Sequence, residues 1–169
     1  MDEQPEIIFR EKQKFGAWIH LMVFTMLFFP VAIFLFAYTS ESPKKFPLEP
    51  IDILPIILDT SIPIVVEIIF LILKLETEVR NDGVYVRLFP AHIKYRKFTP
   101  EEISEAFARK YQPVAEYRGW GIKGSRSNRA YNTRGNEGVQ LVFKNGKKLL
   151  IGSQKAKELE NAIKSILGN

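Results

Sequence analysis

The stretch FGAWIHLMVFTMLFFPVAIFLFAY, residues 15–38, decides the fold, because it runs for 24 residues without Asp, Glu, Lys or Arg. As a helix it is about 36 Å long, which is enough to cross a hydrocarbon core of about 30 Å with some tilt. Pro30 predicts a kink, which membrane helices tolerate. A cleaved signal peptide is the alternative, but its apolar region is usually only about 7–15 residues long. The run therefore predicts a transmembrane helix.

A second apolar run, residues 51–73, contains Asp52, Asp59 and Glu67. Sixteen of its 23 residues are Ile, Leu, Val or Phe, each favouring insertion by about 0.3–0.6 kcal/mol, whereas one central acid costs about 2.5–3.5 kcal/mol. The balance is favourable by a small margin, so we expect this helix to insert against the first, across a short external loop at 39–50. In an alternative, the span begins near Thr60 and the residues before it lie in the interface.

Two polar residues fall at matching depths in these predicted helices. Counted from the loop end at about 1.5 Å per residue, His20 lies about 27 Å down the first helix and Glu67 about 24 Å down the second. Because unpaired polar groups are costly in lipid, we predict a hydrogen bond between them. Asp59 has no partner at its level. A proton or ion path through His20, Asp59 and Glu67 is the functional alternative, although two helices cannot enclose a path without oligomerising.

The basic residues that flank the two runs predict the orientation. Three precede the first run and three follow the second, whereas the loop has two lysines beside two acids. By the positive-inside rule, both termini face the cytoplasm. We therefore expect a multi-pass protein of the inner (cytoplasmic) cell membrane, with residues 1–14 as a cytoplasmic segment. The basic residues are Arg10, Lys12, Lys14, Lys74, Arg80 and Arg87.

Composition separates the two parts of the chain. Residues 74–169 carry 19 Lys and Arg against 10 Asp and Glu, whereas the whole chain has a net charge of +5. A basic domain joined closely to a membrane helix is expected to lie near anionic lipid, where each basic residue gains about 1 kcal/mol; ordinary solubility charge is the alternative. The chain has no cysteine and only two histidines, so we predict no catalytic residues, no metal site and no cofactor.

After Leu73 the periodicity predicts an α+β domain with about seven short antiparallel strands, closed into a partial barrel by one carboxy-terminal helix. Within this domain, residues 81–83 have the sequence of a tight turn and residues 99–102 that of a helix start. The expected strands are 74–80, 84–89, 93–98, 114–117, 119–123, 130–132, 139–143 and 148–151, with a helical turn at 103–110 and the final helix at 154–167.

Four stretches carry a resemblance: EVRNDGVYVRLFP (78–90), RGWGIK (118–123), AYN (130–132) and GKKLLIGSQ (146–154). With strands first and a helix last, residues 74–168 resemble a pleckstrin-homology-like (PH-like) domain, as carried by small prokaryotic membrane proteins that are mostly uncharacterised. The resemblance implies the fold and membrane anchoring of residues 74–169, after a hairpin at 15–73, and implies no activity. The basic loop motif of phosphoinositide-binding PH domains has no residue-by-residue match.

Residues 117–138 form a basic segment with five cations and one acid, Glu137, interrupted by glycines. The cations are Arg118, Lys123, Arg126, Arg129 and Arg134. Backbone amides freed by glycines, together with Arg side chains, can hold phosphate, so the segment is a candidate contact for lipid headgroups or an acidic partner. The alternative is structural: the glycines permit sheet curvature, Trp120 packs in the core and the arginines are solvated.

These features together predict a non-enzymatic, membrane-anchored interaction or scaffold module at the inner face of the membrane. One alternative is binding of anionic lipid headgroups by the basic domain. Another is a small transporter or sensor subunit that uses His20, Asp59 and Glu67. The expected partners are membrane lipids and an unidentified protein; a homo-oligomer is left open, and nucleic acid is not expected because no binding motif is present.

Overall fold

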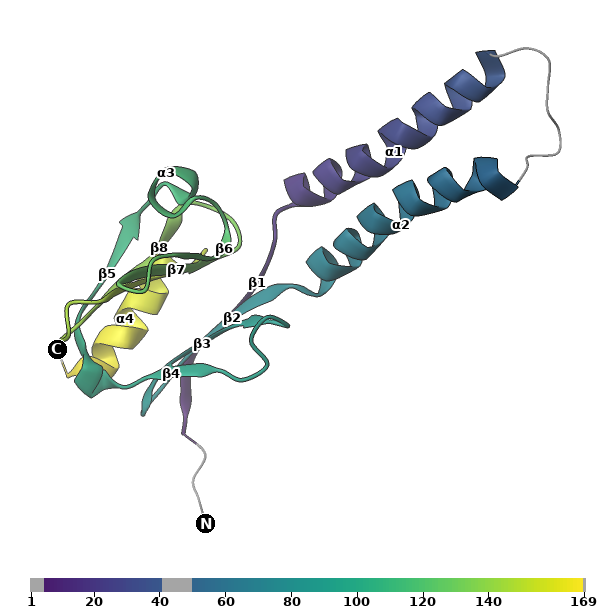
Figure 1. Ribbon diagram of the computed structural model, residues 1–169. Coiled ribbons are helices and arrows are strands. Elements are labelled where there is room, and N and C mark those ends of the chain that lie inside the picture. Colours follow the sequence, from purple (N-terminus) through teal and green to yellow (C-terminus); the bar gives the residue numbers. More distant parts are fainter. Residues whose placement is uncertain (1–4, 41–49, 169) are drawn as a thin grey trace. The chain divides into compact units, whose positions relative to one another are not determined.

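The computed structural model describes residues 5–40 and 50–168 (Figure 1). The chain divides into two compact units. The sheet unit combines the segment up to Phe15 with the segment from Leu73 onward, and the helical unit is Gly16–Ile72. The helical unit is therefore an insertion in the sheet unit.

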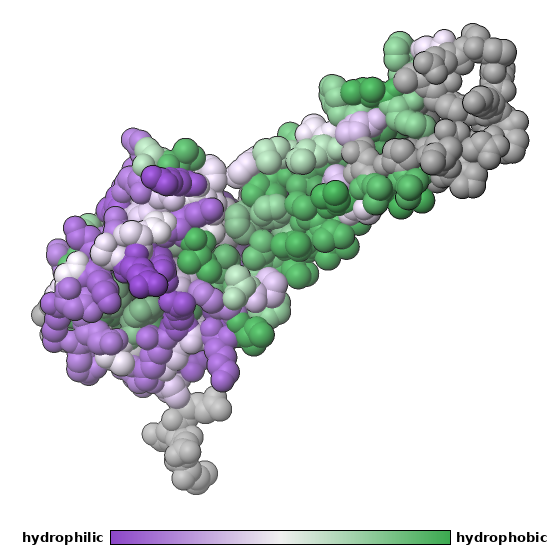
Figure 2. All heavy atoms as spheres, viewed as in Figure 1, coloured by the Kyte–Doolittle hydropathy of each residue, from purple (hydrophilic) through white to green (hydrophobic). Residues whose placement is uncertain are grey.

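The helical unit consists of α1 (Ala17–Ser40) and α2 (Pro50–Ile72), which lie side by side and run antiparallel (Figure 1). Most of the described apolar side chains of both helices are exposed, and Figure 2 shows this unit as a mainly hydrophobic surface. A soluble helix would bury such a face. α1 continues through Pro30.

Within the described residues, one helix is long and apolar enough to cross a membrane, by length and composition. It is the Ala17–Phe34 part of α1, with a mean hydropathy of 2.1. The corresponding apolar part of α2, Thr60–Ile72, is shorter. The predicted first span is thus supported. Over the residues that the structure describes, α2 is not among the helices that meet this criterion; its sequence carries Asp52, Asp59 and Glu67.

The first sheet of the sheet unit has the order β1-β2-β3-β4 and is antiparallel throughout. Its first strand is a correction to the sequence analysis, which treats residues 1–14 as a separate segment. In the structure β1 pairs with β2 across the whole helical insertion, a contact that no local pattern specifies. The strands are β1 (Ile7–Lys14), β2 (Lys74–Arg80), β3 (Gly83–Phe89) and β4 (Arg96–Phe98).

The second sheet has the order β5-β8-β9-β7-β6, and its β7 and β9 run parallel. Within the described residues the unit therefore has nine strands in two sheets, rather than one partial barrel of about seven antiparallel strands. The strands are β5 (Ile103–Lys110), β6 (Gly121–Gly124), β7 (Asn128–Asn132), β8 (Glu137–Phe143) and β9 (Lys148–Gly152).

Two segments have a different secondary structure from the one predicted. Residues 103–110 form strand β5 rather than a helical turn. The helix-start signal produces only the single turn η1 (Pro100–Glu102), and the chain is extended from Ile103 onward. In η1 the Glu102 carboxylate accepts a hydrogen bond from Thr99 N. Residues 113–117 form the short helix α3 (Pro113–Tyr117) rather than a strand. Pro113 at its first position is preset for helical φ.

The predicted carboxy-terminal helix is confirmed as α4 (Ala156–Leu167). Its apolar face contacts both sheets, and Leu159 and Ile163 are fully buried. Burying each such side chain contributes about 1.5–3 kcal/mol. Gly168 ends the helix with φ 78°, a left-handed conformation that favours glycine. The core of the sheet unit therefore lies between α4 and the two sheets.

Candidate functional site

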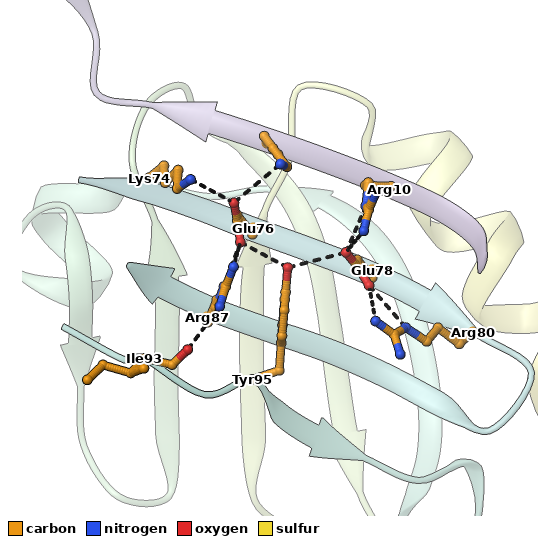
Figure 3. A network of polar contacts seen from close by, with 9 residues as sticks. Arg10, Lys74, Glu76, Glu78, Arg80, Arg87, Ile93 and Tyr95 are labelled. Atoms are coloured by element: carbon orange, nitrogen blue, oxygen red, sulfur yellow. Dashed lines mark hydrogen bonds and ion pairs between the residues drawn. The ribbon is translucent and has the colours of Figure 1, made fainter. Parts of the chain in front are cut away.

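Two acids, Glu76 and Glu78, lie at the centre of a polar network on the first sheet (Figure 3). Both are 1% exposed. Cations from both neighbouring strands surround them, because Lys12 and Arg87 are the register partners of Glu76 and Arg10 is a register partner of Glu78. The network therefore joins β1, β2 and β3 on one face.

The contacts of the network are short. Arg87 Nε donates to Glu76 Oε2 at 2.5 Å, and Arg10 Nε donates to Glu78 Oε1 at 2.7 Å. Tyr95 bridges the two acids, with its hydroxyl 2.9 Å from Glu76 Oε2 and 3.2 Å from Glu78 Oε1. Arg80, Lys74 and Lys12 complete the ion pairs.

Burial alone raises the pKa of Glu76, but hydrogen bonds from Arg87, Tyr95 and Lys74 outweigh it and lower that pKa to about 2. Burial also raises the pKa of Glu78, and hydrogen bonds from Arg80 and Arg10 likewise bring it below its ordinary value. Tyr95 shows the reverse effect, because burial and Glu76 raise its pKa to about 12. At neutral pH the acids stay ionised and the tyrosine stays protonated, so the network holds strands together and is unsuited to proton transfer.

A second feature of the sheet unit is a hollow of about 370 Å³ that we call the basic pocket. It is lined by five cations, three aromatic side chains and one leucine, with no acid among them. The lining residues are Arg96, Phe98, Arg126, Arg129, Tyr131, Phe143, Lys147, Lys148 and Leu149.

The basic pocket is built by two turns, by strands that these turns join and by the edge strand β4. The turn between β6 and β7 supplies Arg126, and the turn between β8 and β9 supplies Lys147. The parallel pairing of β7 with β9 brings these turns together, since Lys148 N donates to Ser127 O at 2.7 Å. Arg96 comes from β4 of the other sheet. The pocket therefore lies where the two sheets meet.

Tyr131 lines the pocket, and its ring centroid lies 5.7 Å from that of His92. Tyr131 is 1% exposed, and burial raises the pKa of its hydroxyl. The charges of Arg96 and Arg129 lower that pKa in part, yet within the described residues the hydroxyl has no hydrogen bond of ordinary geometry. Burial, Arg96 and Arg129 lower the pKa of His92, so His92 is neutral at neutral pH.

The basic segment predicted from the sequence does not form one site. Arg126 and Arg129 line the basic pocket, whereas Arg118 and Lys123 line a separate hollow that also contains Glu116. Arg134 lines neither pocket, and its carbonyl accepts a hydrogen bond from Gln154.

Three cations of the pocket, Arg96, Lys147 and Lys148, lie outside the basic segment predicted from the sequence. They are remote from the segment in sequence, and only the sheet pairing brings them to it. No motif marks their proximity. The signal that could have found two of them is the Asn145-Gly146 turn, which places the adjacent lysines at a strand end.

The predicted hydrogen bond in the helical unit is confirmed. His20 Nδ1 lies 2.6 Å from Glu67 Oε1, from α1 to α2. The bond gives each side chain a polar partner. The side chains of Asp52 and Asp59 lie outside the described residues. Over the ranges that the structure describes, no group of three or more His, Asp or Glu is arranged to hold a metal ion.

Comparison with models of protein families identifies a family to which the chain is similar. The model of a protein family described as a family of unknown function (DUF6141) matches residues 2–169. No curated protein matches the chain. The match covers the helical insertion and both sheets.

Proposed function

The chain belongs to the DUF6141 family of unknown function, and we propose that it is a non-enzymatic, membrane-anchored interaction module. In this proposal α1 and α2 both cross the inner membrane, and the sheet unit is a PH-like domain at the cytoplasmic face. The sheet unit binds the partner, and the helices hold it at the membrane.

The pairing of β1 with β2 carries the proposal. Lys14, at the end of β1, is the register partner of Lys74, at the start of β2. Only Phe15 and Gly16 separate Lys14 from α1, and only Leu73 separates α2 from Lys74. Both ends of the helical insertion are therefore tied to adjacent strands of one sheet. If α1 crosses a membrane, α2 has to return across it.

This geometric requirement applies although α2 carries three acids, Asp52, Asp59 and Glu67. The α1–α2 pair supports insertion of the second helix, because His20 gives Glu67 a partner within the pair. The orientation follows from the basic residues that flank the helices, which favour the cytoplasmic side for the sheet unit. The PH-like interpretation is supported by two sheets followed by a single carboxy-terminal helix, although the parallel β7–β9 pair is an added feature.

Cysteine labelling in intact cells tests this topology, because the chain has no cysteine of its own. Ser40→Cys lies at the loop end of α1, and Ser104→Cys lies at an exposed position of β5. A maleimide that cannot cross membranes should label Ser40→Cys in intact cells and Ser104→Cys only after permeabilisation. Labelling of both positions from the same side would contradict the proposal. The unmodified chain is the control for background labelling.

A second candidate function is direct contact of the sheet unit with anionic headgroups. The row Lys14, Lys74 and Phe89 runs across β1, β2 and β3 at the end that adjoins the helices. Within the described part of the chain, Lys14 makes no ion pair, whereas Lys74 Nζ lies 3.2 Å from a Glu76 carboxylate oxygen. Each basic residue near an anionic surface contributes about 1 kcal/mol.

Retention of anionic lipid by the detergent-purified protein tests the headgroup contact. Lys14→Gln/Lys74→Gln should retain less phosphatidylglycerol than the unmodified protein. Lys123→Gln/Arg134→Gln removes the same charge elsewhere on the sheet unit and should retain the normal amount. Equal retention by both double variants would rule out this row as the contact.

A further inference from the structure

We propose that the basic pocket is a binding site for a phosphate group that carries at least two negative charges, such as pyrophosphate or a phosphomonoester. This inference deepens the proposed function, since it rests on the sheet unit being the part that binds. The recognised chemistry is the phosphate itself, whether it is presented by a membrane lipid or by a soluble compound.

Charge is the first argument. Among the described residues, none of the pocket's five cations makes an ion pair, although the network around Glu76 and Glu78 pairs its cations closely. The unpaired cations are Arg96, Arg126, Arg129, Lys147 and Lys148. Like charges gathered around one hollow repel one another unless an anion lies between them. A phosphodiester, with one charge, would leave most of them uncompensated, so a more highly charged phosphate fits better.

Hydrogen-bonding capacity is the second argument. Three of the five cations are arginines, whose planar guanidinium groups bind phosphate oxygens in pairs. They come from separate places in the fold, with Arg96 on β4, Arg126 on a turn and Arg129 on β7. Donors that converge from several elements can surround a tetrahedral group. A row of arginines along one strand would contact only one side of it.

The Tyr131 hydroxyl is the third argument. Tyr131 is buried, lines the pocket and, within the described residues, has no hydroxyl hydrogen bond of ordinary geometry. A buried hydroxyl without a hydrogen-bond partner destabilises the fold. A phosphate oxygen in the pocket would accept the hydrogen bond that Tyr131 leaves unused.

The size and walls of the pocket describe the rest of the ligand. A volume of about 370 Å³ lies in the range of small-molecule sites and exceeds the needs of one phosphate. Phe98 and Phe143, with ring centroids 5.3 Å apart, form an apolar side beside the cations, together with Leu149. The pocket therefore has room for an apolar or planar group attached to the phosphate.

Calorimetric titration of pyrophosphate into the full chain, held in nanodiscs of phosphatidylcholine, tests the site. We expect saturable binding that sulfate does not match. Arg126→Gln/Arg129→Gln should weaken binding by about tenfold to a hundredfold, because hydrogen bonds to charged groups are lost. Lys123→Gln/Arg134→Gln changes the total charge equally outside the pocket and should bind within about twofold of the unmodified protein. Tyr131→Phe should weaken binding by about threefold to tenfold.

Absence of pyrophosphate binding, equal binding of sulfate, or equal losses in the two double variants would overturn the proposal. Circular dichroism and the thermal midpoint of each variant show whether it is folded. Nanodiscs that contain phosphatidic acid, a phosphomonoester lipid, separate the two sources. Weaker apparent binding of pyrophosphate there supports a lipid headgroup as the ligand, and unchanged binding supports a soluble phosphate compound. The cysteine-labelling result is independent of both, so either proposal can fail alone.

Discussion

The imidazole of His20 and the carboxylate of Glu67 lie 2.6 Å apart, although 47 residues separate them in the chain. The contact joins α1 to α2 within the helical unit. It ties the helix that has a clear membrane-spanning character to the helix that carries an acid, and it gives that acid a polar partner.

A double-mutant cycle should detect this bond. His20→Ala and Glu67→Ala should each lower the stability of the full chain in detergent, and the double variant should lose less than their sum. We expect a coupling of about 1 kcal/mol, as for other hydrogen bonds between membrane helices. Denaturant titration followed by circular dichroism measures it. Thr25→Ala is the control partner, because Thr25 bonds to Met22 of its own helix; its cycle with Glu67→Ala should be additive. Strict additivity in both cycles would exclude the His20–Glu67 bond.

Acid should destabilise the sheet unit through Glu76. Its pKa is about 2 in the folded state against an ordinary value of 4.5, so the unfolded chain binds the proton first as the pH falls. The stabilisation is fully present above about pH 4.5 and is lost between pH 4.5 and pH 2, with a total of at most about 3 kcal/mol. Thermal midpoints measured across this range should fall.

Glu76→Gln provides the comparison for this prediction. The variant should be less stable at neutral pH, because Arg87 and Lys74 lose their buried counter-charge. It should also show a flatter dependence on pH below 4.5. A variant as sensitive to acid as the unmodified chain would mean that other groups dominate the acid transition.

Gly124 and Gly146 should respond differently to alanine. Both have positive φ, 89° and 77°, so alanine costs about 1–2 kcal/mol of backbone strain at either position. At Gly146 an added Cβ meets open space, whereas at Gly124 it collides with the backbone carbonyl of Asn128. Gly124→Ala should therefore lower the thermal midpoint clearly further than Gly146→Ala. Because the Gly124 turn holds Arg126, pyrophosphate binding should also weaken more in Gly124→Ala than in Gly146→Ala. Equal midpoints would show that the turn relaxes freely.

His92 should titrate below its ordinary pKa of 6.5, because it is partly buried and lies near Arg96 and Arg129. Since the unfolded chain takes the proton first, the contribution of His92 to stability declines as the pH falls below about 6.5. Arg129→Gln should shift the pKa upward. In a His20→Gln background His92 is the only histidine, so its ring carbon signal in NMR reports the titration directly. No upward shift in Arg129→Gln would place the arginine charge away from the ring.

Local patterns predicted the parts of the fold that depend on neighbouring residues. The apolar run at 15–38 became α1, the Asn81-Asp82-Gly83 turn joined β2 to β3, and the amphipathic pattern near the carboxy terminus became α4. The matching depths of His20 and Glu67 along the two helices were also sufficient to predict their hydrogen bond, since helix geometry converts residue number directly into distance. Local signals failed at 103–110 and 113–117, where pairing with β8 and the position of Pro113 decided the outcome.

The candidate site could be predicted only in part. The charge of residues 117–138 is visible in the sequence, and two of its arginines do line the basic pocket. Arg96, Lys147 and Lys148 join them through strand pairing over distances that no periodicity encodes. For the same reason the sequence could not show which of the five arginines and lysines of that segment would lie outside the basic pocket.

The sequence by itself determined the apolar helix, the basic charge of the domain that follows it and the amphipathic carboxy-terminal helix, because these are properties of residues close together in the chain. Only the tertiary structure decided that β1 pairs with β2, so that Lys14 faces Lys74 and the helices are an insertion in a sheet. It alone decided that Arg96 meets Arg129 at one pocket. Backbone hydrogen bonds between strands act without regard to sequence separation, and they make neighbours of residues that the chain holds far apart.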